Sequence, residues 1–199
     1  MDERRYAGIT LDAQAIKVLA HPLRSRLLSR LRTAGPATAT DLAGALHTNT
    51  GATSYHLRKL ESVGLVTDTG EGEGKRRLWR ASTNYHSWTN SAFRDDEDAA
   101  TALDWLQRDY VRQMAEKAER WLDAAPDWPA EWVDVFGLND TFVTVTPEQM
   151  RELNARLDAL LVEYRTIGEG DPRARRASVS TFARPMDPDL GPESAEAGR

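Results

Sequence analysis

The sequence contains no cysteine among its 199 residues, which excludes disulfides, thiolate metal sites, iron–sulfur clusters and cysteine nucleophiles. It has no run of about 18 apolar residues, the length that a membrane span requires. The opening MDERRYAGIT lacks the apolar segment of a secretory signal, so we expect a cytoplasmic protein without membrane contact. A glycine-rich phosphate loop, G-x-S-x-G and H-E-x-x-H are also missing, and we therefore expect neither an enzyme nor a cofactor.

Histidine is scarce, and its positions do not predict a metal site. His21, His47, His56 and His86 lie on separate predicted elements and lack ligand spacing. We interpret His21 as structural and His56 as a packed, hydrogen-bonded side chain. The acidic run at 95–98 lacks the loop glycine of a calcium site, and the solvated first turn of a helix explains it better. No metal ion is therefore expected.

Charge differs between the two halves of the chain. Residues 1–90 hold 13 Lys and Arg against 8 Asp and Glu, whereas residues 91–199 hold 13 against 23. A basic surface attracts polyanions, so any binding of nucleic acid is expected in the N-terminal half. Ordinary charge scatter without functional meaning is the alternative.

Hydrophobic residues at helical spacing predict a series of helices in the first half. Residues 10–33 fit two helices in succession. Thr38 and Asp41 have the spacing of a capping box, which opens a short helix at about 39–46. After a turn, a longer helix follows at about 51–63, with apolar residues on one side and polar and cationic residues on the other.

Two short strands and a glycine-rich loop follow these helices. Strand-like residues at 65–67 and 75–80 flank the loop GEGEG at 70–74. Helices followed by a basic two-stranded wing predict a winged helix-turn-helix domain over residues 1–82, whose helix at 51–63 would enter a major groove of DNA. The alternatives are a solvated helix face and a charged hairpin without a partner. The expected DNA contacts are Asn49, Thr50, Thr53, Ser54, Tyr55, Arg58, Lys59, Lys75, Arg76 and Arg77.

Four short segments occur in a characteristic order. They are LAHPLRSRLL at 19–28, ATDLA at 39–43, SYHLRKL at 54–60 and GLV at 64–66. With the basic wing behind them, they resemble the ArsR-type winged helix-turn-helix repressors over about residues 11–82. The resemblance implies a homodimeric bacterial transcription regulator that binds operator DNA. It also implies recognition roles for Thr50, Thr53, Ser54, Tyr55 and Arg58.

Metal sensing, which many of those repressors perform, is not implied here. Their sensing cysteines lie near the helix at 39–46, where this chain has no thiol. Others use histidine and carboxylate ligands on a C-terminal dimer helix, whereas the predicted helix at 92–124 has no histidine. The C-terminal part exceeds the minimal family fold and resembles the extension of some actinobacterial regulators with this winged helix.

The second half of the chain is predicted as a dimerisation and effector domain at 92–183. A polar connector at 83–91 precedes it, and a disordered tail at 184–199 follows. The long helix at 92–124 carries an apolar stripe that needs a partner, either a second copy or the C-terminal region. We expect this helix to supply much of a homodimer interface.

A small α+β region completes the predicted fold. Thr146 and Gln149 have the spacing of a second capping box, which opens a helix that ends at Gly168. Strands are predicted at 142–146 and 178–183, paired with each other. The expected fold class is therefore mainly α with a small β wing: a winged helix-turn-helix domain, a long dimerisation helix and a small α+β C-terminal region.

Aromatic residues are concentrated after the wing, with five of the six tryptophans between residues 88 and 132. They would line a pocket for an apolar or aromatic effector, or form only the core of a domain or dimer interface. The sequence leaves both interpretations open. The residues concerned are Trp88, Trp105, Tyr110, Met114, Trp121, Trp128, Trp132 and Phe136.

These patterns together predict a sequence-specific DNA-binding transcription regulator. We expect a homodimeric repressor on a near-palindromic operator in double-stranded DNA, released by a small apolar or aromatic effector. A winged-helix module that binds another protein is one alternative. A constitutive DNA binder without an effector is the other.

Overall fold

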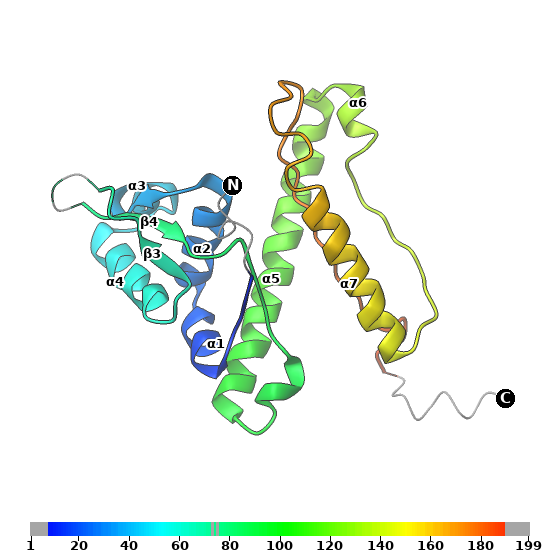
Figure 1. The fold of residues 1–199 in the computed structure, drawn as a ribbon, viewed down its shortest axis with the longest axis horizontal. Helices are drawn as coiled ribbons and strands as arrows, with labels where there is room; N and C mark the ends of the chain where they lie inside the picture. The colour runs from blue at the N-terminus through cyan, green and yellow to red at the C-terminus, as the bar shows by residue number, and fades with distance from the viewer. Residues whose placement is uncertain (1–7, 73, 75, 190–199) are drawn as a thin grey trace. The chain divides into compact units, whose positions relative to one another are not determined.

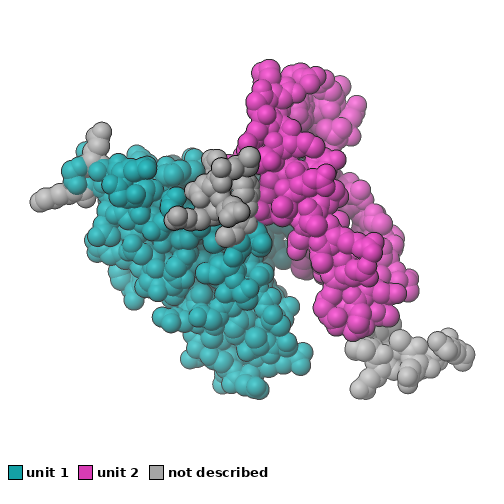
Figure 2. Space-filling view, viewed as in Figure 1, with its two compact units in different colours: residues 1–122 teal, residues 123–199 magenta. Residues whose placement is uncertain are grey.

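The computed structural model describes residues 8–72, 74 and 76–189 of the chain. Its contacts divide into two compact units, residues 1–122 and 123–199, which Figure 2 colours separately. The division falls inside the long helix, whose first half packs on the core of the N-terminal elements.

The first four helices of unit 1 follow the order that the sequence predicts (Figure 1): α1 (Ala13–Leu19), α2 (Pro22–Ala34), α3 (Ala39–Ala45) and α4 (Thr50–Glu61). Each starts at a side chain that accepts a hydrogen bond from a backbone N–H of the first turn. The first capping box is confirmed. Asp41 N donates to Thr38 Oγ1 at 3.2 Å, and Thr38 N donates to Asp41 Oδ2 at 3.1 Å.

A three-stranded antiparallel sheet forms the wing, in the order β2 (Ala37–Thr38), β4 (Leu78–Ala81) and β3 (Val66–Asp68). β3 and β4 confirm the two predicted strands, and Val66 lies opposite Ala81. β2 was not predicted, because two residues in front of a helix are too few to show an alternating pattern.

A second sheet lies partly in the segment predicted as a polar connector, 83–91. β1 (Gly8–Thr10) pairs in parallel with β5 (Tyr85–Ser87), and a 3-10 helix (Asn90–Phe93) follows. The long helix α5 (Glu97–Ala124) begins after it, later than predicted. Strands of three residues depend on pairing between distant segments, which local composition does not reveal.

One apolar cluster forms the core of unit 1 and joins the helices to the wing. Leu57 and Leu60 of α4 are fully buried in it. α5 contributes Leu103 and Leu106 to the same cluster, from the first half of its apolar stripe. The first half of the predicted stripe is therefore buried inside unit 1.

Two polar contacts fix α5 to the helices of unit 1. Lys17 of α1 forms an ion pair with Asp96, at 2.9 Å between Nζ and Oδ2. Ser25 of α2 donates to Asp109 Oδ2 at 2.8 Å, and this hydrogen bond is buried. Gln113 Nε2 lies 2.7 Å from both acceptor oxygens and completes the cluster. Because buried polar groups need directed partners, these contacts set the position of α5 along α2.

A half-buried histidine, His86, joins α2, β5 and α5. Arg32 Nη1 donates to His86 Nδ1 at 2.6 Å, and His86 Nε2 lies 2.7 Å from Tyr110 Oη. Arginine can only donate, so Nδ1 carries no proton, and the neutral ring donates from Nε2 to Tyr110. Burial and the charge of Arg32 lower the pKa of His86 to about 3. Burial also lowers the pKa of Arg32 to about 10.

Unit 2 contains a 3-10 helix (Ala125–Asp127) and the helices α6 (Ala130–Val133) and α7 (Pro147–Glu163). The second capping box is confirmed, with Thr146 N donating to Gln149 Oε1 at 2.9 Å and Gln149 N donating to Thr146 Oγ1 at 3.3 Å. No residue in the described part of unit 2 is buried. Among the described residues, no helix has the length and apolar character needed to cross a membrane.

The strands predicted at 142–146 and 178–183 are wrong, because neither segment pairs with another in the described structure. Their apolar residues face solvent instead, with Phe142 66% and Phe182 63% exposed. Alternating apolar and hydroxyl residues fit a half-buried strand, but a strand also requires a neighbouring backbone to pair with. Most of the predicted tail at 184–199 lies outside the described residues.

His86 makes the free energy of unfolding depend on pH. Folded His86 stays neutral because its pKa is about 3, whereas the unfolded ring takes up a proton near its ordinary 6.5. The unfolded state therefore binds more protons in acid, so this stability is fully present above about pH 6.5 and is lost toward pH 3. Between pH 7.5 and 5, we expect His86 to account for a loss of about 2 kcal/mol in urea unfolding.

His86→Gln is the control, because glutamine does not titrate in this range. Other histidines contribute equally to both proteins, so the difference between the two pH profiles isolates His86. Identical profiles for the wild type and the variant would contradict this assignment.

Candidate nucleic-acid interface

A tight turn between α3 and α4 sets the start of the predicted recognition helix. His47 in this turn adopts a positive φ of 51°. Asn49 Oδ1 then accepts a hydrogen bond from Ala52 N at 2.7 Å, which caps α4. The side-chain oxygen of Asn49 is thus occupied by this hydrogen bond, and the side-chain NH2 group remains available to donate to a ligand. The exposed backbone N–H groups of this first turn favour an anion.

The exposed face of α4 carries most of the predicted DNA contacts. Thr50, Arg58 and Lys59 are exposed, and Tyr55 is 54% exposed. Lys59 Nζ lies 5.8 Å from the centre of the Tyr55 ring, which places a cation over an aromatic face. Ser54 is half-buried beside them. Residues of this kind provide the hydrogen-bond donors and acceptors that read base edges in a major groove.

Thr53 is a correction to the predicted contacts, because it faces the core. Its exposed fraction is 0%, and its Oγ1 is buried without a hydrogen-bond partner among the described residues. Residues four apart lie on one side of a helix, so Thr53 shares the buried face of Leu57. Thr53 therefore packs α4 against the core, and its side chain is not exposed for contact with a ligand.

The loop between β3 and β4 has two described cations, Arg76 and Arg77, with different surroundings. Arg77 pairs with Asp68 at 3.4 Å and with Glu61, the last residue of α4, at 3.9 Å. Its guanidinium also lies 5.7 Å from the ring centre of Trp79. Arg77 thus connects the wing to α4 through its ion pair with Glu61. Arg76 is exposed on the same loop. Lys75, also predicted to contact DNA, lies outside the described residues.

Two histidines pack together between α2 and α4. The ring centres of His21 and His56 are 4.4 Å apart, and Tyr55 meets His56 edge-on at 5.1 Å. His56 is packed as predicted, but its buried Nδ1 has no hydrogen-bond partner in the described structure. Burial lowers the pKa of both rings, and Arg24 nearby lowers both further.

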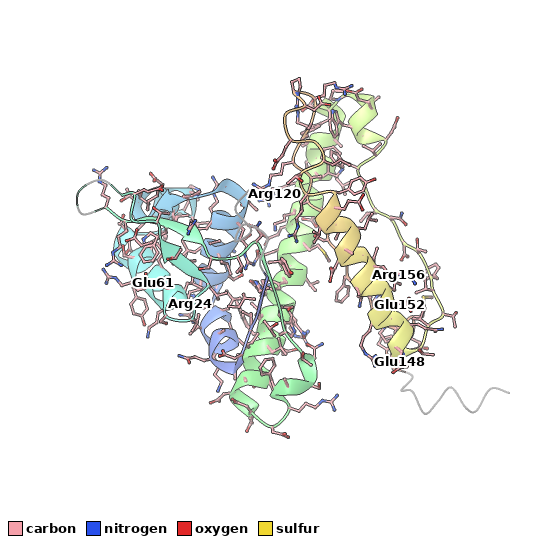
Figure 3. All side chains as sticks on the ribbon, in the orientation of Figure 1. Arg24, Glu61, Arg120, Glu148, Glu152 and Arg156 are labelled. Atoms are coloured by element: carbon pink, nitrogen blue, oxygen red, sulfur yellow. The ribbon has the colours of Figure 1, made fainter. Side chains whose placement is uncertain are left out.

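Arg24 of α2 was not among the predicted contacts. Its Nε donates to the backbone oxygen of Val18, and with Lys59 it lines a surface depression of about 540 Å³. Figure 3 labels Arg24 together with Glu61 at the end of α4. The approach of α2 to α4 is a tertiary contact, so sequence spacing carried no signal for this residue.

The eight residues predicted for an effector pocket fall into groups in different units. Trp88 lies 6.1 Å from Tyr110 in unit 1, between ring centres. In unit 2, Trp132 stacks on Phe136 at 5.4 Å, and Trp128 meets the same ring edge-on at 6.5 Å. Two depressions on the described part of unit 1 are lined by other side chains. Trp105 packs at the edge of the core of unit 1, and Met114 and Trp121 are half-buried on α5.

The assignment of Thr53 to the core predicts the effect of its substitution. Thr53→Val removes a buried hydroxyl without a partner and keeps the branched shape, so we expect the free energy of unfolding to rise by about 1 kcal/mol. DNA affinity should stay unchanged. Ser54→Ala, next along α4, is the control for stability and should change it little. Weaker DNA binding by Thr53→Val, measured by fluorescence anisotropy, would contradict this assignment and indicate that Thr53 contributes to the DNA interface.

Comparison with known families supports this geometry over one part of the chain. A family model described as a helix-turn-helix domain matches residues 19–69. The matched range contains α2, α3, α4 and β3, which are the elements that position the exposed face described above. No curated protein matches the chain. The N-terminal part of the chain is therefore a helix-turn-helix domain, which is typical of DNA-binding transcription regulators.

Proposed function

We propose that the chain is a sequence-specific repressor of transcription that acts as a homodimer on a near-palindromic operator. The observation that carries this proposal is the division of α4 into two faces. Leu57 and Leu60 are fully buried, while Tyr55, Arg58 and Lys59 face solvent. A helix held in this way presents its polar face to a major groove without any rearrangement of the domain.

Arg58 is the proposed base-reading residue. It is exposed near the middle of the polar face and makes no ion pair within the described structure. A free guanidinium can donate two parallel hydrogen bonds to a guanine edge in the major groove. Arg76 on the wing is the proposed contact to backbone phosphate, which adds affinity but no sequence preference.

A homodimer is proposed because a near-palindromic operator requires two recognition helices, one helical turn apart. The second half of α5 supports this, since Val111 is 42% and Leu122 60% exposed. A second copy packed along this segment would cover them. The repressor role follows from the resemblance of residues 11–82 to the ArsR-type repressors.

Release by an apolar or aromatic effector remains a prediction of the sequence. The observation that supports an effector site is the cluster of aromatic rings that Trp128, Trp132 and Phe136 form in unit 2. An effector bound there would quench tryptophan fluorescence in a saturable way and weaken operator binding at the same concentrations. A constitutive DNA binder would show neither effect with any compound of a broad aromatic panel.

Substitution of the two arginines separates base reading from phosphate binding. Arg58→Ala should lower operator affinity by about 1–3 kcal/mol and reduce the preference over scrambled DNA, because alanine cannot hydrogen-bond to the base. Arg76→Ala should weaken binding to both DNAs alike and reduce the salt dependence, because alanine cannot neutralise a phosphate. Fluorescence anisotropy at two salt concentrations, with DNA from upstream of the chain's own gene, measures both effects.

Arg156→Ala on α7 is the charge-matched control, and it should leave DNA binding unchanged. Normal operator binding by the Arg58→Ala, Arg76→Ala double variant would contradict the proposed surface. Binding of a protein partner with little salt dependence, in place of DNA, would favour the winged-helix interaction module.

A further inference from the structure

A cationic depression lies on unit 1 beside the recognition helix. Its volume is about 540 Å³. Three helices contribute to it, α1, α2 and α4, and half of its lining residues are cations. The lining residues are Ala13, Gln14, Lys17, Val18, Arg24 and Lys59.

Two of the three cations lack a carboxylate partner. Lys17 is compensated by Asp96, at 2.9 Å. Arg24 is half-buried and held through its Nε, which donates to the backbone oxygen of Val18. Neither Arg24 nor Lys59 forms an ion pair with any described residue. The remaining N–H groups of Arg24 thus stay available for an acceptor. Burial lowers the pKa of Arg24, because the desolvation of its charge outweighs the favourable interaction with Tyr55.

The depression lies on the side of α4 away from the wing. Lys59 and Glu61 are two residues apart, which places them about 160° apart around the helix axis. Glu61 is the residue that Arg77 of the wing contacts. Lys59 instead faces α1 and α2, where Arg24 lies. Cations therefore occupy both sides of α4, with the exposed Tyr55 and Arg58 between them.

We propose that Arg24 and Lys59 bind one backbone phosphate of DNA, on the strand opposite the one that the wing contacts. This inference rests on the proposed function of α4. A helix in a major groove lies between two rows of phosphates, one from each strand. The wing reaches one row with Arg76, and the depression receives a phosphate of the other. Arg24 supplies oriented N–H donors, and Lys59 supplies a point charge at the rim.

The salt dependence of DNA binding tests this proposal without knowledge of the operator, because phosphate binding is independent of sequence. The probe is a random duplex, titrated by fluorescence anisotropy at several salt concentrations. The slope of log K against log salt falls in magnitude by about 0.9 for each phosphate that the protein no longer neutralises. We expect Arg24→Gln and Lys59→Gln each to weaken binding about three- to tenfold at low salt.

Combinations of variants decide whether the two residues share one phosphate. The Arg24→Gln, Lys59→Gln double variant should lower the slope by about 0.9, since both groups serve the same phosphate. Addition of Arg76→Ala should lower it by about 0.9 more, since the wing binds a different phosphate. Arg26→Gln is the matched control, because Arg26 is exposed on the opposite side of α2 and should leave the slope unchanged.

Three outcomes would overturn the inference, and they are distinguishable. An unchanged slope in the Arg24→Gln, Lys59→Gln double variant would reject the phosphate site and leave the function of α4 intact. Binding of inorganic phosphate that Arg24→Gln abolishes, together with an unchanged DNA slope, would assign the site to a free anion. Absence of DNA binding by the wild type would reject the proposed function itself. Lys59→Gln alters only an exposed side chain and keeps the test valid if Arg24→Gln unfolds.

Discussion

The burial of Leu57 and Leu60 against the core of unit 1 is the contact on which the other features depend. Both side chains are fully buried, and full burial of two leucines contributes about 3–6 kcal/mol. Their burial fixes the rotation of α4 about its own axis. Successive residues of a helix are rotated by about 100° around its axis. The rotation that buries the two leucines therefore also directs Arg58 toward solvent and Thr53 toward the core. The polar surface of α4 is thus a geometric consequence of its apolar face.

α2 is the element through which this arrangement extends to the long helix. It packs on α4, and it holds α5 through the buried hydrogen bond of Ser25 to Asp109 and through Arg32 and His86. Unit 1 consequently includes most of α5, so a contact that moves this helix acts on the same core that orients α4. A dimer formed along the second half of α5 would therefore set the separation of two recognition helices through packed and hydrogen-bonded side chains.

The sequence predicted those features that depend on short-range chemistry. Both capping boxes, at Thr38 and Thr146, were predicted because a hydroxyl and an acceptor three residues later define them locally. The order of four helices and a wing followed from hydrophobic spacing. Features that depend on distant parts of the chain were not predicted correctly. The pairing of β1 with β5 and the position of Arg24 were missed. The strands predicted at 142–146 and 178–183 were wrong, because these segments have a suitable pattern but no neighbouring backbone to pair with. Thr53 was misassigned because a hydroxyl on a DNA-binding helix suits either face.

Hydroxyl-radical footprinting of the wild-type chain on DNA from upstream of its own gene tests whether the protein is a sequence-specific dimeric regulator. We expect two protected segments of similar sequence, separated by one helical turn of about 10 base pairs and related by inverted symmetry. Protection should be weaker for Arg58→Ala than for the wild type at a protein concentration that just saturates the wild type. Uniform weak protection along the whole fragment, or none at any protein concentration, would contradict a sequence-specific dimeric regulator.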